Sequence, residues 1–220
     1  MDVTRKPNMT VFKHFDRIRI INLASRTDRR REMAKELDRV GLKNDPRVSY
    51  FNAVRPNDAG KFTSIGARGC YESQKQILRE AAEANQSVLI LEDDCEFIQG
   101  AQDYDLPSGW DIFYGGHFAA NPDDLQNSDI IGTHMMGFSS TGAKAVSAYL
   151  EQLEFDGIHP PIDAAYVWFR RAYPKTITQF AEPALAGQRS SRSDIADLKW
   201  YDRVPIVRTA ASVLRVMRRG

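Results

Sequence analysis

The stretch Ser87-Val88-Leu89-Ile90-Leu91-Glu92-Asp93-Asp94 joins an unbroken apolar run to three consecutive acids. The run over residues 87–91 is typical of a strand that is buried on both faces, as in a parallel sheet. Acids directly after a buried strand are costly unless something recruits them. In open α/β sheets, ligands bind at the carboxyl ends of the strands. We therefore expect an α/β fold whose ligand site includes Glu92, Asp93 and Asp94.

Strand and helix patterns alternate through the first 150 residues, and this alternation predicts a mostly parallel sheet flanked by helices. The expected strands are 18–23, 48–54, 87–91, 110–114 and 134–140. The expected helices are 29–40, with Gly41 as its C-cap, 67–85 and 143–153. Residues 119–129 look like a surface loop, residues 162–171 fit a helix or a strand, and residues 187–193 form a polar segment.

Length and composition indicate an ordinary soluble globular protein. The chain has 220 residues, which suits one domain or one domain with a small appendage. Its formal net charge of +1 argues against a dedicated nucleic-acid-binding protein. The two cysteines, Cys70 and Cys95, do not make a disulfide framework and fit a reducing compartment. Residues 1–15 lack the apolar run of a secretory signal, so we expect a cytoplasmic protein.

The last part of the sequence has a different character. Residues 1–200 are expected to form the domain, and residues 201–220 a basic amphipathic C-terminal helix with five arginines. Such a helix fits peripheral contact with an anionic membrane, on the cytoplasmic face of the inner membrane. It equally fits a terminal helix that docks on the domain and keeps its arginines in water. Both interpretations stay open.

The acidic cluster itself indicates metal or phosphate chemistry. Alternation along the strand places Glu92 and Asp94 on the same side. Two carboxylates on one side suit Mg²⁺ or Mn²⁺, which would also hold a diphosphate. The same pattern occurs at a merely polar strand end, and in metal-dependent phosphotransferases and hydrolases. The acidic cluster alone does not distinguish a metal and diphosphate site from a polar strand end, or one class of enzyme from another.

Several motifs in the sequence resemble those of glycosyltransferase family 25. They are Ile20-Ile21-Asn22-Leu23-Ala24-Ser25-Arg26-Thr27-Asp28-Arg29-Arg30, Phe51-Asn52-Ala53-Val54, Gly69-Cys70-Tyr71-Glu72-Ser73, Leu89-Ile90-Leu91-Glu92-Asp93-Asp94, residues 137–144, Pro161-Ile162-Asp163, and Gln188 with Ser193-Asp194-Ile195. Each motif is unspecific, but the matches follow the family's order from about residue 18 to residue 195.

The resemblance implies a GT-A-like, Rossmann-type fold, a UDP-sugar donor such as UDP-galactose, and a divalent metal. It also implies a donor site that Glu92, Asp93 and Asp94 share with residues from the other motifs. Those residues are Asn22, Leu23, Arg26, Asp28, Arg29, Ala53, Val54, Ser73, Gln74, Gln188 and Ser193. Arginine suits bidentate contact with phosphate, although Arg26, Asp28 and Arg29 also fit a solvated first turn of a helix.

One position departs from the family pattern. The family usually has a histidine after the serine of its Gly-Cys-x-x-Ser motif, whereas this chain has Gln74. Glutamine forms hydrogen bonds but does not titrate near neutral pH. A binding role is therefore compatible with Gln74, and an acid–base role is not.

The remaining requirement of sugar transfer is a base that deprotonates the acceptor hydroxyl. Asp163 is our candidate, acting with Asp94 at the reacting centre of an inverting enzyme. From local sequence Asp163 fits the N-cap of a helix after Pro160-Pro161 equally well. His134, beside Met135-Met136, fits assistance to the metal or diphosphate, but a lone histidine in such surroundings is more often structural, and we leave it outside the main set. The sequence thus predicts a glycosyltransferase of lipooligosaccharide or surface polysaccharide biosynthesis that acts on a glycan or glycolipid acceptor. The alternatives are a catalytically inactive nucleotide-sugar-binding protein and a metal-dependent phosphotransferase or hydrolase.

Overall fold

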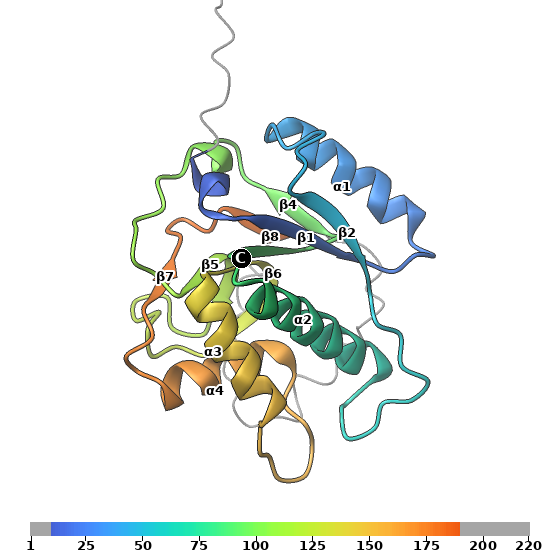
Figure 1. The fold of residues 1–220 in the computed structure, drawn as a ribbon, viewed down its shortest axis with the longest axis vertical. Helices are drawn as coiled ribbons and strands as arrows, with labels where there is room; N and C mark the ends of the chain where they lie inside the picture. Colours follow the sequence, from blue (N-terminus) through green and yellow to red (C-terminus); the bar gives the residue numbers. More distant parts are fainter. Residues whose placement is uncertain (1–9, 190–220) are drawn as a thin grey trace, which may run out of the picture.

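The computed structural model of the chain describes residues 10–189, which are built around a mixed six-stranded sheet in the order β2-β1-β3-β6-β5-β7 (Figure 1). A second, two-stranded sheet pairs β4 with β8. The strands are β1 (Arg17–Asn22), β2 (Val48–Asn52), β3 (Val88–Glu92), β4 (Cys95–Phe97), β5 (Ile112–Ala119), β6 (Ile130–Phe138), β7 (Thr178–Phe180) and β8 (Ala186–Gln188).

Five strands of the large sheet run in one direction and β6 runs in the other. The pairs β1–β2, β1–β3 and β5–β7 are parallel, whereas β6 is antiparallel to both β3 and β5. The carboxyl ends of β1, β2, β3 and β5 and the start of β6 therefore meet at one edge of the sheet. The predicted α/β class, with a mostly parallel sheet flanked by helices, is confirmed.

Four α-helices connect and cover the strands. They are α1 (Thr27–Arg39), α2 (Ile65–Ala84), α3 (Ser140–Glu151) and α4 (Ile162–Ala172); short 3-10 helices occupy Val11–His14 and Ala101–Asp103. Side-chain caps fix two helix starts, because the hydroxyl oxygens of Ser64 and Ser139 accept hydrogen bonds from backbone N–H groups in the first turns of α2 and α3.

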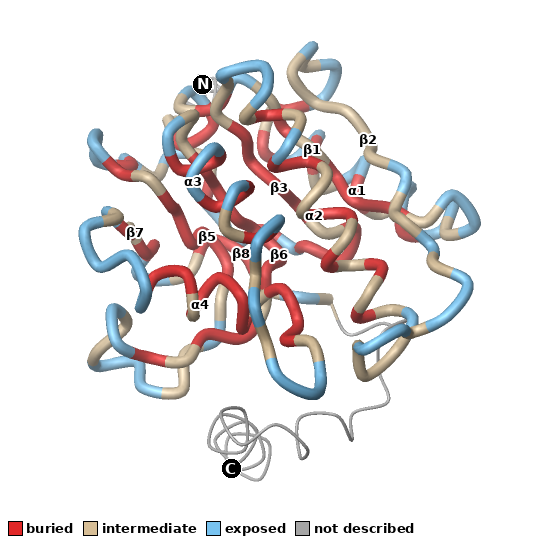
Figure 2. Tube along the Cα trace, turned by 60° about the horizontal axis from the view of Figure 1, so that its bottom comes forward, coloured by how far each residue is buried: buried red, intermediate tan, exposed pale blue. Residues whose placement is uncertain are grey.

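The two faces of the sheet are covered by different elements. Helices α2, α3 and α4 pack together on one face, and α1 with the β4–β8 ribbon lies on the other (Figure 1). Both layers bury the apolar alternation of the central strands: Leu89 and Leu91 contribute to the α1 side, and Val88 and Ile90 to the α2 side. Figure 2 shows the central strands buried along most of their length. This burial on both faces is what the apolar run of β3 predicted.

The structure changes several predicted boundaries. The strand expected at 110–114 extends to Ala119, the strand expected at 134–140 begins at Ile130, and residues 162–172 form a helix. The N-cap of α4 is Pro161, so Asp163 lies inside the first turn and is not the cap. Helix α1 ends at Arg39, and its C-cap is Val40. Gly41, the next residue, has the left-handed backbone conformation, with φ of 81°. Part of the expected polar segment, up to Gln188, is strand β8.

Two predictions fall on residues that the structure does not describe. The basic helix expected at 201–220 and the binding role expected for Ser193 both lie outside residues 10–189. Within the described part of the chain, no helix has the length and apolar character that crossing a membrane requires.

Candidate functional site

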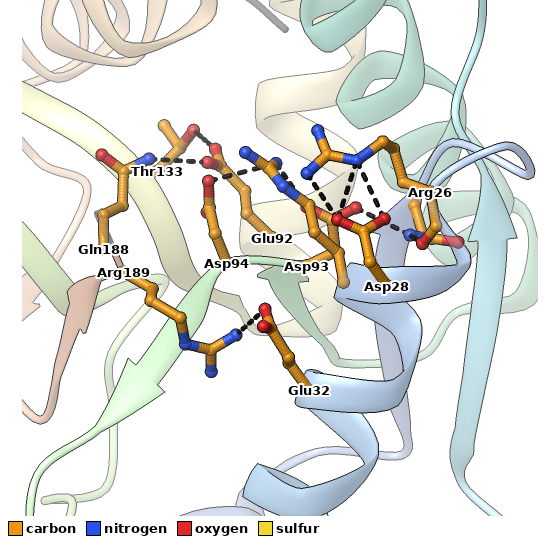
Figure 3. Close-up of polar contacts among 11 residues, drawn as sticks. Arg26, Asp28, Glu32, Glu92, Asp93, Asp94, Thr133, Gln188 and Arg189 are labelled. Atoms are coloured by element: carbon orange, nitrogen blue, oxygen red, sulfur yellow. Dashed lines mark hydrogen bonds and ion pairs between the residues drawn. The ribbon is translucent and has the colours of Figure 1, made fainter. Parts of the chain in front are cut away.

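The candidate site lies where β3 ends, between α1 and the β4–β8 ribbon (Figure 3). Glu92 is the last residue of β3, and Asp93 and Asp94 form a tight turn into β4. The backbone carbonyl of Asp94 accepts a hydrogen bond of 2.8 Å from the N–H of Arg189, directly after β8. The three carboxylates are thus held in place by strands on either side of the turn.

Arg29 neutralises part of this acidic cluster. Its Nη1 lies 2.8 Å from Oδ1 of Asp93 and 3.2 Å from Oδ2 of Asp94. The amide of Asn22 donates to the other oxygen of Asp93 at 2.7 Å. Arg29 is only 8% exposed, so its guanidinium lies beneath the site and not on the solvated face of α1. Each oxygen of Asp93 in this way has a partner, one from β1 and one from α1.

Asp94 has one oxygen, the buried Oδ1, that accepts no hydrogen bond from residues 10–189. Burial raises the pKa of Asp94 to about 6, the charge of Glu92 adds to the rise, and Arg29 and His134 oppose it. Carboxylates that stay buried and incompletely paired lower the stability of a fold, and such groups cluster at functional sites.

Glu92 has different surroundings, because both of its oxygens accept hydrogen bonds from neutral groups. Thr133 donates to Oε1 at 2.6 Å, and Gln188 donates to Oε2 at 3.0 Å. Thr133 in turn accepts from Gln74 at 2.7 Å, and Gln74 accepts from the hydroxyl of Tyr166 at 2.8 Å. Burial raises the pKa of Glu92, and the hydrogen bonds from Thr133 and Gln188 oppose that rise.

Ser73 and Gln74 are both fully buried on α2, although the sequence placed them in the donor site. The hydroxyl of Ser73 accepts from the backbone N–H of Val54 at 2.8 Å and donates to the carbonyl of Gly69 at 2.6 Å. Gly69 permits this approach, since a Cβ there would lie 2.5 Å from the carbonyl oxygen of Val54. The Gly-Cys-x-x-Ser motif therefore fixes the chain just after β2, where Ala53 and Val54 are half-buried.

Asp163 reaches the same edge of the sheet from the first turn of α4. Its Oδ2 accepts from the N–H of Gly132 at 3.4 Å, and its Oδ1 accepts from the N–H of Ala164 at 2.9 Å. Burial raises the pKa of Asp163, and these backbone hydrogen bonds oppose the rise. The charge of Asp163 also contributes to the raised pKa of Glu92, so the structure brings these two carboxylates into one electrostatic environment.

The outer rim of the site is formed by the β1–α1 turn and by the end of β8. Arg26 and Asp28 pair with each other at 2.9 Å, and the Arg26 guanidinium holds the pKa of the exposed Asp28 well below its usual range. On the opposite rim Arg189 pairs with Glu32 of α1 at 2.7 Å (Figure 3). These pairs border the carboxylates from α1 and from β8. Leu23 directly follows Asn22 at the end of β1, and it is half-buried.

The fit of a metal ion to this site is partial. Within residues 10–189, no group of three or more histidine, cysteine, aspartate or glutamate side chains is arranged to hold a metal. Hard cations such as Mg²⁺ are, however, commonly held by one or two carboxylates together with substrate phosphates and water. Asp94 offers an oxygen for such a cation, because its Oδ1 accepts no hydrogen bond among the described residues.

Sequence reasoning missed the residues that support the carboxylates. Thr133 lies within β6 and Tyr166 on α4, and neither carries a local signal, because threonine in a strand and tyrosine in a helix are ordinary core residues. His134 is fully buried, and its Nε2 lies 2.9 Å from the carbonyl oxygen of Ala186, which agrees with a structural role. The burial of Arg29 was also missed, since arginine at a helix start is usually solvated.

Comparisons with known proteins find distant similarity to solved structures and none to family models or curated proteins. No protein-family model and no curated protein matches the chain. A solved glycosyltransferase that is involved in glycosylation of the major capsid of PBCV-1 is similar, with a TM-score of 0.48, 13% identity, and coverage of 80% of this chain and 94% of that one. The CTP:phosphocholine cytidylyltransferase of Streptococcus pneumoniae gives a TM-score of 0.41, 12% identity, and coverage of 88% and 81%. These likenesses concern the course of the backbone and carry no information on activity.

Proposed function

We propose that this chain is a glycosyltransferase that takes a sugar from a nucleotide diphosphate donor, with UDP as the nucleotide, and transfers it to a glycan or glycolipid acceptor. The observation that carries the proposal is the surplus of carboxylates at the end of β3. Glu92, Asp93 and Asp94 lie together there with Arg29 against two of them, and one oxygen of Asp94 has no donor in the part of the chain that the structure describes. A buried negative surplus at a strand end suits a divalent cation and the diphosphate it carries.

In this proposal Asp94 and Glu92 would hold Mn²⁺ or Mg²⁺, and the bound ion would supply positive charge to the leaving diphosphate. Asp93 pairs with Arg29 and Asn22 through its two oxygens and keeps the β3 turn in place. The nucleotide lies against the end of β1 and the chain after β2, near Leu23, Arg26, Asp28, Ala53 and Val54. Gln188 covers the donor from the β8 side.

Asp163 removes the proton from the acceptor hydroxyl, whose oxygen attacks the anomeric carbon as the bond to the diphosphate breaks. Its raised pKa suits this role, because a base is most effective when its pKa approaches the working pH. The backbone N–H groups of Gly132 and Ala164 orient its carboxylate. Direct attack of this kind inverts the anomeric configuration, and we assign the reaction to surface-glycan synthesis on the cytoplasmic side.

The test is an assay of the purified chain against a panel of UDP-, GDP-, CMP- and dTDP-sugars with Mn²⁺, beginning with UDP-galactose. Release of the nucleotide from one donor class, and transfer to a saccharide acceptor with inversion seen by NMR, is the expected result. Binding of UDP without release or transfer would indicate an inactive nucleotide-sugar-binding protein. Cleavage of phosphate esters in place of sugar transfer would indicate a hydrolase or phosphotransferase.

A further inference from the structure

A continuous chain of hydrogen bonds runs through the core to the candidate site. It begins at the hydroxyl of Tyr166 on α4, which donates to Oε1 of Gln74 on α2 at 2.8 Å. Gln74 Nε2 donates to Oγ1 of Thr133 on β6 at 2.7 Å, and Thr133 donates to Oε1 of Glu92 at 2.6 Å. Four residues that are distant in sequence, from two helices and two strands, thus meet in one row of polar contacts.

These hydrogen-bonded side chains lie in the core, where burying polar groups lowers the stability of the fold. Tyr166 and Gln74 have no exposed surface and Thr133 is 3% exposed, and the surrounding side chains of α2, α3 and α4 are apolar. Each buried polar group gives up its hydration, and a well-packed apolar side chain of the same shape is often as stable in such a place. The polar residues must therefore be explained by what they do at the end of the chain, which is Glu92.

The direction of the chain follows from the chemistry of its members. An ionised carboxylate only accepts hydrogen bonds, so Thr133 must donate its single proton to Glu92. The hydroxyl oxygen of Thr133 then accepts from an amide N–H of Gln74, which leaves the Gln74 carbonyl to accept from Tyr166. Residue 74 must therefore present one donor and one acceptor at the same time. Glutamine does so, and so does neutral histidine, whereas methionine and glutamate do not.

The two oxygens of Glu92 are consequently unlike. Oε1 is held from within the core, whereas Oε2 accepts from Gln188, an exposed residue of β8. We propose that Tyr166, Gln74 and Thr133 are positioning residues that fix Oε1 of Glu92 and so leave Oε2 as the oxygen that faces the metal and diphosphate. This inference rests on the proposed function, and it assigns the support of the donor site to three residues that do not touch the donor.

The experiment compares variants of nearly the same shape, with UDP in the presence of Mn²⁺ as the probe. Thr133→Val and Gln74→Met break the chain, and each should weaken UDP binding about 10-fold, the loss expected for a hydrogen bond to a charged group. Thr133→Ser and Gln74→His restore the required donors and acceptors, and both should bind UDP nearly as well as the wild type. Thr178→Val, the same change at a buried threonine of β7, is the matched control.

A second comparison asks whether Thr133 acts through Glu92. In a Glu92→Met background, Thr133→Val should cause no further loss of UDP binding, because the oxygen that Thr133 positions is gone. A full additional 10-fold loss would show a general packing effect and would overturn the inference. Failure of Gln74→His to restore binding, in a variant that melts with the wild type, would overturn it as well.

The inference and the proposed function fail in different ways. Coupling between Thr133→Val and Glu92→Met in the free energy of unfolding requires no ligand, and the hydrogen-bond chain predicts that it is present. A wild-type protein that shows this coupling but binds no UDP would refute the proposed function and, with it, the role of Glu92 Oε2. Normal UDP binding without coupling would refute the positioning chain alone.

Discussion

Replacement of Arg29 by methionine removes the cation that lies against Asp93 and Asp94 and leaves a side chain of similar length. The side chains of Arg29, Asp93 and Asp94 are 9%, 8% and 12% exposed, so water does little to compensate for the loss. Breaking a buried ion pair by removing one partner costs about 3–5 kcal/mol. We expect Arg29→Met to lower the free energy of unfolding by this amount at pH 8.

The loss of stability in Arg29→Met should be larger at high pH than at low pH. The pKa of Asp94 in the folded protein is raised from 3.8 to about 6, so the charge of Asp94 opposes folding, and its unfavourable contribution grows as the pH rises through this interval. A rise of about 2 pKa units corresponds to about 3 kcal/mol. Without Arg29 the pKa of Asp94 rises further. At pH 5, where Asp94 is largely protonated, Arg29→Met should therefore cost less than at pH 8.

The assay is urea denaturation followed by tryptophan fluorescence at pH 5 and pH 8. Arg31→Met is the control, because Arg31 is exposed on the same helix. Asp94→Asn in the Arg29→Met background should recover part of the stability at pH 8. A stabilising buried pair is refuted if the free energies of unfolding of Arg29→Met and Arg31→Met differ by less than about 0.5 kcal/mol, the usual effect of a surface change. It is also refuted if Arg29→Met costs the same at both pH values.

Two further predictions concern the surroundings of the carboxylates. Gly69→Ala places a Cβ 2.5 Å from the carbonyl oxygen of Val54. This change should lower the free energy of unfolding by about 1–3 kcal/mol in the same denaturation assay and should weaken UDP binding. Gly187→Ala is the control, because its Cβ meets nothing within 4 Å, and it should leave the free energy of unfolding unchanged. Asp163→Asn should lower kcat for sugar transfer by about 10²- to 10⁴-fold with little change in UDP affinity; a decrease of less than 10-fold would remove Asp163 as the base.

Local patterns in the sequence predicted several of the helices and strands. The unbroken apolar run of β3 and the 3.6-residue spacing in α1 and α2 predicted these elements within a few residues of their observed bounds. The strands β4, β7 and β8 could not be predicted, because each has three residues and exists only through pairing with a distant segment. Residues 162–172 form a helix whose apolar side packs on α2, α3 and β6. These contacts involve segments distant in sequence, so the local pattern alone could not decide between a helix and a strand.

The place of the acidic cluster at the end of β3 could be predicted from the sequence, but the contacts among its side chains could not. The acids after β3 marked the edge where the ligand site was expected, and the structure gathers Asn22, Arg29 and Gln188 around them. The partners of Glu92 depend on how β6 and α4 pack against α2, and no local pattern reports that packing. For the same reason the departure at Gln74 was ambiguous in sequence. In the structure it is the middle of a buried hydrogen-bond chain.

The central claim is that Asp94 and Glu92 bind a metal-associated nucleotide diphosphate, and calorimetry of UDP with and without Mn²⁺ tests it most directly. The wild-type chain should bind UDP when Mn²⁺ is present and at least about 10-fold more weakly without it, the difference expected from the loss of a charge-assisted contact. Asp94→Asn should remove the dependence on Mn²⁺. Equal binding of UDP by the wild type and by Asp94→Asn, or no binding by either under both conditions, would contradict the claim.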